Sequence, residues 1–152
     1  MKLVELFPIE RVFVGVDVAS RRDLLAFFAQ KAAELGLVDR QDCQQGLADR
    51  EDLGSTGLGN GIAIPHTRIE GLDHAIGMFA TLARPIDFEA VDQEPVDITF
   101  MLILPEQASG EPMKALSRVA KIARQEPITN ALRRAQSSEE ALAIFQKADA
   151  EL

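Results

Sequence analysis

The chain has 152 residues, enough for one domain with a hydrophobic core, and 47% of them are hydrophobic, as in ordinary globular proteins. Its formal net charge of −8 argues against a nucleic-acid-binding protein and against docking on anionic membranes, because both favour basic surfaces. The single cysteine excludes an internal disulfide, and the most apolar stretch is far too short to span a bilayer. Together with an N-terminus that lacks a secretory signal, these features predict a cytoplasmic protein without membrane insertion.

The first fifty or so residues predict a strand followed by two helices. Valines alternate with other residues over 12–16, as in a strand. Ser20 is a candidate N-cap for a helix that Gly36 ends. Asp39 is a candidate N-cap for a second helix that runs toward Arg50, just before a glycine-rich segment.

The rest of the chain alternates between strands and helices. Apolar runs predict three strands, the last of them buried on both faces, at 62–64, 75–82 and 96–104. Helical spacing of apolar residues predicts three helices, the last with a capping box of Ser137 and Glu140, around 116–123, 128–135 and 141–148. Because strands and helices are interleaved and no linker divides the chain, we predict an α/β fold in a single compact domain, residues 1–152.

The segment 54–68 carries the strongest functional signal, and it reads Gly-Ser-Thr-Gly-Leu-Gly-Asn-Gly-Ile-Ala-Ile-Pro-His-Thr-Arg. Its glycines allow backbone N–H groups to approach an anion closely. His66, at the end of the apolar part, has the chemistry of a nucleophile toward a phosphoryl group, and Arg68 can neutralise the phosphoryl oxygens. The segment matches neither the P-loop nor the dinucleotide-binding fingerprint. The pattern therefore predicts a phosphorylatable histidine.

Several residues near this segment have both structural and functional interpretations. Arg50 is either a solvated helix end or a contact to a phosphoryl group. Ser55 and Thr56 are either turn residues or phosphate ligands. The second histidine, His74, follows Asp73 in a polar turn and is interpreted as a surface residue. The histidines, the cysteine and the acidic residues show no standard metal-ligand spacing, so we predict no metal and no cofactor.

These residues resemble a known family. The strings that carry the resemblance are Asp49-Arg50-Glu51, Gly54-Ser55-Thr56-Gly57 and Gly61-Ile62-Ala63-Ile64-Pro65-His66. They are similar to the enzyme IIA domains of the fructose–mannitol class of the bacterial phosphotransferase system. Strings that resemble its nitrogen-regulatory branch include Gly59-Asn60-Gly61, Pro95-Val96-Asp97 and Arg134-Ala135-Gln136-Ser137. The resemblance covers nearly the whole chain and implies a mixed sheet flanked by helices.

For the site, the resemblance implies that His66 accepts a phosphoryl group from a small histidine-phosphorylated carrier protein. Arg50 matches the family's phosphate-positioning arginine, and Arg68 is a candidate support. The predicted phosphoryl-binding residues, from the motif and its glycine-rich loop, are Arg50, Ser55, Thr56, Gly59, Asn60 and Gly61. The chain departs from the family at Pro112, which takes the place of a second active-site histidine at the start of a helix. Because the nucleophile is retained, we expect acceptance at His66 to survive this change.

The leading interpretation is a phosphorelay protein whose phosphorylation state regulates partner proteins. A phosphohistidine intermediate would make it a phosphocarrier of the phosphotransferase system rather than a small-molecule enzyme. Two alternatives remain open. One is a sugar-transport enzyme IIA that passes its phosphoryl group to a IIB domain, and the other is a binding module without phosphoacceptance. The chain contains no IIB or membrane domain, which favours regulation.

Overall fold

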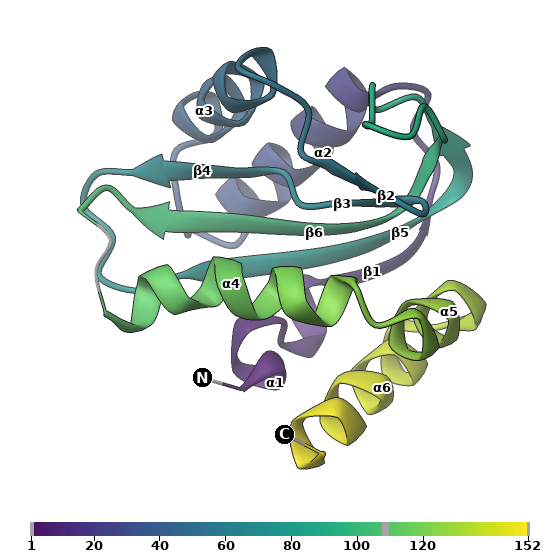
Figure 1. Cartoon of the computed structure of the whole chain (residues 1–152). Coiled ribbons are helices and arrows are strands. Elements are labelled where there is room, and N and C mark those ends of the chain that lie inside the picture. The colour runs from purple at the N-terminus through teal and green to yellow at the C-terminus, as the bar shows by residue number, and fades with distance from the viewer. Residues whose placement is uncertain (1, 108–109, 152) are drawn as a thin grey trace.

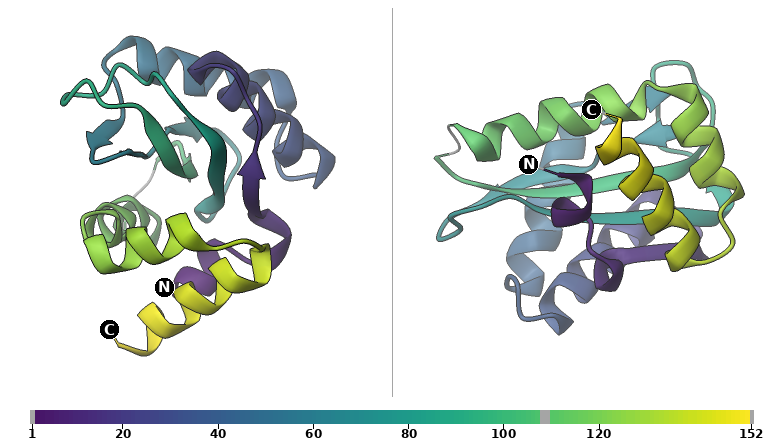
Figure 2. Two further views of the ribbon diagram at one scale, coloured as in Figure 1. Left: turned by 90° about the vertical axis from the view of Figure 1, so that its right-hand side faces the viewer. Right: turned by 90° about the horizontal axis from the view of Figure 1, so that it is seen from below.

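A mixed six-stranded sheet is covered by helices on both faces in the computed structural model, which describes residues 2–107 and 110–151 (Figure 1, Figure 2). The helices are α1 (Leu3–Leu6), the 3₁₀ helix η1 (Ile9–Arg11), α2 (Arg21–Glu34), α3 (Arg40–Asp52), α4 (Glu111–Ala123), α5 (Glu126–Arg134) and α6 (Ser138–Ala150). The strands are β1 (Val12–Val16), β2 (Gly57–Gly59), β3 (Ile62–Ala63), β4 (His66–Ile69), β5 (Ile76–Ile86) and β6 (Val96–Pro105). These elements confirm the predicted α/β class and the mixed sheet.

The strand order places the histidine motif along one edge of the central strand β6. The order is β1-β5-β6-β3-β2, and β4 also pairs with β6. β1 is parallel to β5, β5 is antiparallel to β6, and both β3 and β4 are parallel to β6. β3 and β4 therefore follow one another along the same edge, with Ile62 opposite Ile98 and His66 opposite Leu102.

Two hydrophobic layers fill the space between the sheet and its helices. α2 and α3 cover one face, whereas α1, α4, α5 and α6 cover the other (Figure 1). Alternate residues of β6 enter opposite layers. Phe100 and Leu102 pack with the layer of α4 to α6, and Met101 and Ile103 pack with the layer of α2 and α3. This double burial explains why the sequence of β6 is almost continuously apolar.

Side-chain caps begin the helices largely where the sequence predicts. At α2, Ser20 Oγ accepts a hydrogen bond of 3.1 Å from the Asp23 N–H. At α6, Ser137 Oγ accepts from the Glu140 N–H at 3.1 Å, as in a capping box. The reciprocal bond differs from the prediction, because the Glu140 carboxylate accepts from the N–H of Gln136, at 2.6 Å, instead of that of Ser137.

The structure also contains elements that the sequence patterns did not predict. β4 begins at His66 and has neither an apolar run nor strict alternation, so nothing in its sequence indicates a strand. It forms because its backbone pairs with β6. The short elements α1, η1 and β2 contain too few residues for a periodic signal. In the part of the chain that the structure describes, no helix is both long and apolar enough to cross a membrane.

Candidate functional site

His66, the first residue of β4, is a half-buried imidazole whose proton position is fixed by its surroundings. Its Nδ1 lies 2.8 Å from Ile64 O. Since a carbonyl oxygen can only accept, Nδ1 carries the proton and Nε2 keeps the lone pair. Burial is the main reason that the pKa of His66 lies below its ordinary value, and Arg50 and Arg68 lower it further, whereas the Ile64 carbonyl and Glu51 oppose the shift. The ring is therefore neutral at neutral pH, with its Nε2 lone pair unprotonated.

A buried carboxylate ties the loop 53–56, which connects α3 to β2, to the segment before His66. Glu51, only 4% exposed, accepts a 3.0 Å hydrogen bond from the Thr56 N–H and a second one from the Thr56 hydroxyl. The Thr56 carbonyl in turn accepts from the Ile64 N–H at 3.1 Å. Sequence reasoning missed this role of Glu51, because a run of charged residues at a helix end carries no signal of burial.

The Ser55 hydroxyl also serves the loop itself. It donates to Phe88 O and accepts a 3.0 Å hydrogen bond from the Gly57 N–H. The two hydroxyls predicted to bind a phosphoryl group, those of Ser55 and Thr56, thus both have protein partners in the unmodified protein. In this arrangement they hold the loop 53–56 beside the segment that leads to His66.

Two arginines lie within electrostatic range of the histidine from different elements. Arg50, in the last turn of α3, donates through Nη1 to Gly54 O at 2.8 Å. Arg68, on β4, donates through Nη1 to Glu106 O at 3.4 Å. No carboxylate among the described residues forms an ion pair with either guanidinium. Their charges are therefore available to an anion at His66.

The turn 59–61, in contrast, is not brought to His66. It joins β2 to β3, and Asn60 has a φ of 58°, so the turn is a hairpin of left-handed residues. The Asn60 N–H donates to Asp92 Oδ2 at 2.9 Å, and its carbonyl accepts from Arg133 Nη2 at 3.1 Å. The registers on β6 separate the start of β3 from His66 by four residues, roughly 13 Å along a strand. This placement corrects the expectation that Gly59, Asn60 and Gly61 share one cradle with His66.

The position of the family's second histidine lies on the same side of the sheet as Arg68. Pro112 is half-buried in the first turn of α4, where its missing N–H has no intrahelical partner to lose. The next residue, Met113, accepts a long contact of 3.7 Å from Arg68 Nη2 through its sulfur. His74 lies in an exposed turn, with its Nδ1 2.6 Å from Asp73 Oδ1.

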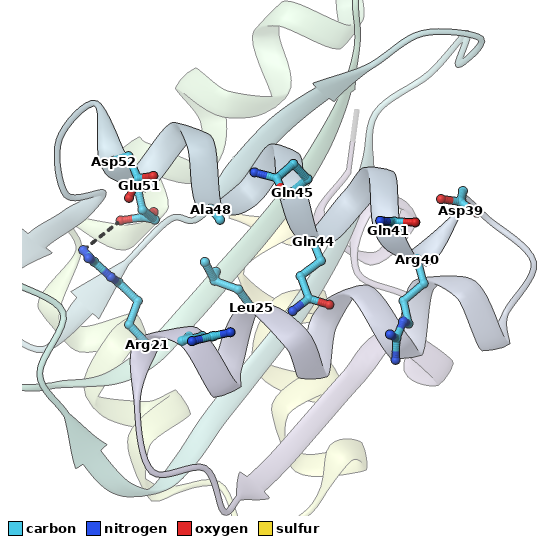
Figure 3. Close-up of a pocket in the computed structure, with 11 residues that line it drawn as sticks. Arg21, Leu25, Asp39, Arg40, Gln41, Gln44, Gln45, Ala48, Glu51 and Asp52 are labelled. Carbon is cyan, nitrogen blue, oxygen red and sulfur yellow. Dashed lines mark ion pairs between the residues drawn. The ribbon is translucent and has the colours of Figure 1, made fainter.

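A groove between α2 and α3 adjoins the site but has a different character (Figure 3). Neither His66 nor Arg50 lines it. Figure 3 shows the ion pair at one end of the groove, where Arg21 Nη1 lies 3.7 Å from Glu51 Oε1. Its basic and acidic residues balance one another: Arg21, Arg22 and Arg40 against Asp39, Glu51 and Asp52. The groove therefore has no excess of either charge, and Glu51 links it to the loop beside His66 through Thr56.

Comparisons with known proteins identify the relatives of this chain. The family described as "Phosphoenolpyruvate-dependent sugar phosphotransferase system, EIIA 2" matches residues 5–148. The nitrogen regulatory protein of Bradyrhizobium diazoefficiens is 39% identical over 145 residues, which cover 95% of this chain and 93% of that protein. The nitrogen regulatory protein of Pseudomonas aeruginosa is 37% identical over 147 residues, covering 96% and 94%.

A solved structure extends the agreement to three dimensions. The crystal structure of the nitrogen regulatory protein IIA-Ntr from Neisseria meningitidis matches with a TM-score of 0.86 at 35% identity, covering 93% of this chain and 97% of that one. Sequence and fold thus both point to nitrogen regulatory proteins. The chain belongs to the EIIA 2 family of the phosphoenolpyruvate-dependent sugar phosphotransferase system, on the branch of the nitrogen regulatory proteins, and is a component of its phosphoryl relay.

Proposed function

We propose that His66 accepts a phosphoryl group from a histidine-phosphorylated carrier protein, and that residues 1–152 act as one phosphoacceptor domain whose phosphorylation state regulates partner proteins. The observation that carries the proposal is the hydrogen bond between His66 Nδ1 and Ile64 O, 2.8 Å long. It leaves Nε2 unprotonated, and the lowered pKa of His66 keeps the ring neutral. Such a ring is ready to attack phosphorus.

The transfer needs no general base. The Nε2 lone pair of His66 forms the new N–P bond while the N–P bond of the carrier's phosphohistidine breaks, and the carrier's imidazole leaves with that electron pair. His66 keeps its Nδ1 proton throughout, so positive charge develops on its ring. The Ile64 carbonyl, which already accepts from Nδ1, stabilises that charge.

Neutralisation of the phosphoryl oxygens is the second requirement of the reaction. Arg50 and Arg68 both act electrostatically on His66, and neither is paired with a carboxylate among the described residues. Arg50 approaches from α3 beside Gly54, so it is the proposed phosphate-positioning residue. Ser55 and Thr56 contribute by shaping the loop 53–56, whose hydroxyls and N–H groups hold it in place.

Regulation of partner proteins follows from the charge that phosphorylation adds. The ring acquires a phosphoryl group whose oxygens carry about two negative charges, which changes what the surrounding surface binds. The relatives at 39% and 37% identity are named nitrogen regulatory proteins, and this chain spans more than nine-tenths of their length. Their names support regulation over sugar transport as the role of the phosphorylated form.

The test is phosphoryl uptake from a phosphorylated histidine carrier, with the modified residue mapped by mass spectrometry. The wild type and His74→Ala should be labelled at His66, whereas His66→Ala should take up nothing. His74 is the matched control because it is the chain's other histidine and is exposed. Labelling of His66→Ala would end the proposal, and absence of any labelling would favour a pure binding module. Efficient onward transfer to a IIB domain would favour sugar transport.

A further inference from the structure

His66 and Arg68 present their side chains on the same face of β4. Side chains alternate along a strand, and the residue between them, Thr67, is buried. Thr67 points at α3, because a Cβ on Gly46 of that helix would lie 2.3 Å from Thr67 Oγ1. His66 and Arg68 therefore point away from α3, and two strand residues place them roughly 7 Å apart.

Among the residues that the structure describes, the Arg68 guanidinium of the unmodified protein has only weak partners. Its Nη1 lies 3.4 Å from Glu106 O and its Nη2 lies 3.7 Å from Met113 Sδ. Neither acceptor is charged, and a thioether is a weak acceptor. Arg133 illustrates the contrast, because its Nε donates to the carboxylate of Asp97 at 2.7 Å. Arg68 thus combines a full positive charge with partners that a strong anion would displace.

A phosphoryl group on His66 would be such an anion, placed on the face of β4 that Arg68 already shares. Charge-assisted hydrogen bonds from arginine to phosphate oxygens are shorter and stronger than bonds to a carbonyl or a thioether. We propose that Arg68 is a phosphoryl-responsive residue: it leaves Glu106 and Met113 when His66 is phosphorylated, holds the phosphoryl oxygens, and thereby frees the first turn of α4. This inference rests on the proposed acceptance at His66.

The loss of the Arg68 contact would make the surface around Met113 differ between the phosphorylated and the unmodified protein. Met113 is 37% exposed, so the contact with Arg68 covers a side chain at the molecular surface. When Arg68 moves to the phosphoryl group, the sulfur of Met113 and the carbonyl of Glu106 lose their guanidinium partner. A regulated protein that binds near Met113 would then distinguish the two forms without touching His66 itself.

The experiment uses methionine methyl NMR on protein phosphorylated with phosphoramidate, a small donor that needs no docking surface. Its P–N bond breaks, ammonia leaves, and the phosphoryl group forms a bond to His66 Nε2. Mass spectrometry first establishes the modification at His66. The Met113 methyl signal, assigned with Met113→Leu, should move on phosphorylation, whereas those of the buried Met78 and Met101 should stay in place.

Arg68→Ala separates the proposed motion from a simple field effect of the phosphoryl group. In this variant the Met113 signal should start displaced and move little on phosphorylation. The phosphohistidine lifetime should shorten roughly tenfold, as for loss of one charge-assisted hydrogen bond, and Arg68→Lys should restore part of it. Arg124→Ala, which removes an exposed arginine at the other end of α4, is the charge-matched control and should behave as wild type.

The outcomes are distinguishable. Equal Met113 shifts in wild type and Arg68→Ala, or equal phosphohistidine lifetimes, would overturn the role of Arg68 while leaving acceptance at His66 intact. Absence of modification at His66 in the wild type would overturn the proposed function, and the inference with it. A displaced signal that stops responding, together with a shortened lifetime, supports both.

Discussion

The Glu51 carboxylate accepts two hydrogen bonds from Thr56, one from the Thr56 backbone N–H at 3.0 Å and one from the Thr56 hydroxyl. The carboxylate that makes them is almost entirely buried, and its remaining ionic contact is Arg21 at 3.7 Å. Since Thr56 O pairs with the Ile64 N–H, this contact transmits the position of the α3 end to the residue that orients His66. The conformation of the loop 53–56 and the orientation of the His66 ring are therefore coupled.

Glu51→Gln should destabilise the protein and slow phosphoryl uptake. The amide keeps the shape but loses the charge that holds Arg21 and Thr56, and a mismatched buried hydrogen bond costs about 1–3 kcal/mol. Urea unfolding measures the loss. Glu89→Gln is the control, because Glu89 is the exposed partner of Arg21 and its exposed pair should change stability by no more than about 0.5 kcal/mol. Equal stability of the two variants would contradict the structural role of Glu51.

Arg50→Ala should unfold near wild type while accepting phosphoryl groups poorly. The residue makes one hydrogen bond, to Gly54 O, and no ion pair with the described residues, so its loss should cost within about 0.5 kcal/mol. The variant also lacks the positive charge that stabilises the phosphoryl group during transfer, so uptake should be slower. Thermal unfolding and initial uptake rates measure the two effects. Arg22→Ala, an exposed arginine of the neighbouring α2, should leave both unchanged. An unchanged rate in Arg50→Ala would reduce Arg50 to a solvated helix end.

The pH dependence of stability should reveal the lowered pKa of His66. Below the ordinary histidine value of about 6.5, the unfolded chain binds a proton that buried His66 resists. This contribution to stability is fully present above that value and is lost as the pH falls through the folded pKa. Urea unfolding between about pH 5 and 7 should therefore show a shallower acid slope for His66→Gln than for wild type. Parallel slopes would show that the pKa of His66 is ordinary.

Pro112→His should retain the fold and uptake but alter the phosphohistidine. Pro112 occupies the first turn of α4, next to the Arg68 contact at Met113, and histidine adds a side-chain donor there. The phosphohistidine lifetime and the transfer to a IIB domain are the measurements. Pro127→His, which changes the proline in the first turn of α5, controls for the loss of a helix-starting proline. If Pro112→His matches wild type in both measurements, the missing histidine is irrelevant to this protein.

Gly61→Ala should destabilise the protein without abolishing acceptance at His66. Gly61 has a φ of +81°, and an added Cβ would lie 2.9 Å from both Arg133 Nη2 and Asp97 Oδ1. Gly71→Ala carries similar backbone strain at φ +94° but has open space around its Cβ. It therefore measures the cost of the backbone strain without a side-chain clash. Disruption of the Arg133 contacts should make Gly61→Ala the less stable variant by about 1 kcal/mol. Loss of uptake by the folded Gly61→Ala protein would instead return the turn 59–61 to the phosphoryl site.

The sequence by itself determined the features that depend on neighbouring residues. Ser20 and Asp39 begin α2 and α3 because a side chain and an N–H three residues later need only local geometry. The apolar run of β6 indicated a strand buried on both faces, since no other environment in a globular domain suits so many apolar residues. The motif around His66 likewise identified the candidate nucleophile from residue types in a fixed order.

Only the tertiary structure decided which of these residues meet. β4 forms because its backbone pairs with β6, a segment far away in the chain. No periodicity in the sequence of His66–Ile69 predicts this pairing. Glu51 is buried because α3 packs on the sheet and Thr56 supplies donors. The turn 59–61 lies away from His66 because an extended backbone along β6 separates residues that are close in sequence. Long-range strand pairing thus set the geometry of the candidate site, whereas the residue types in the sequence had already indicated its chemistry.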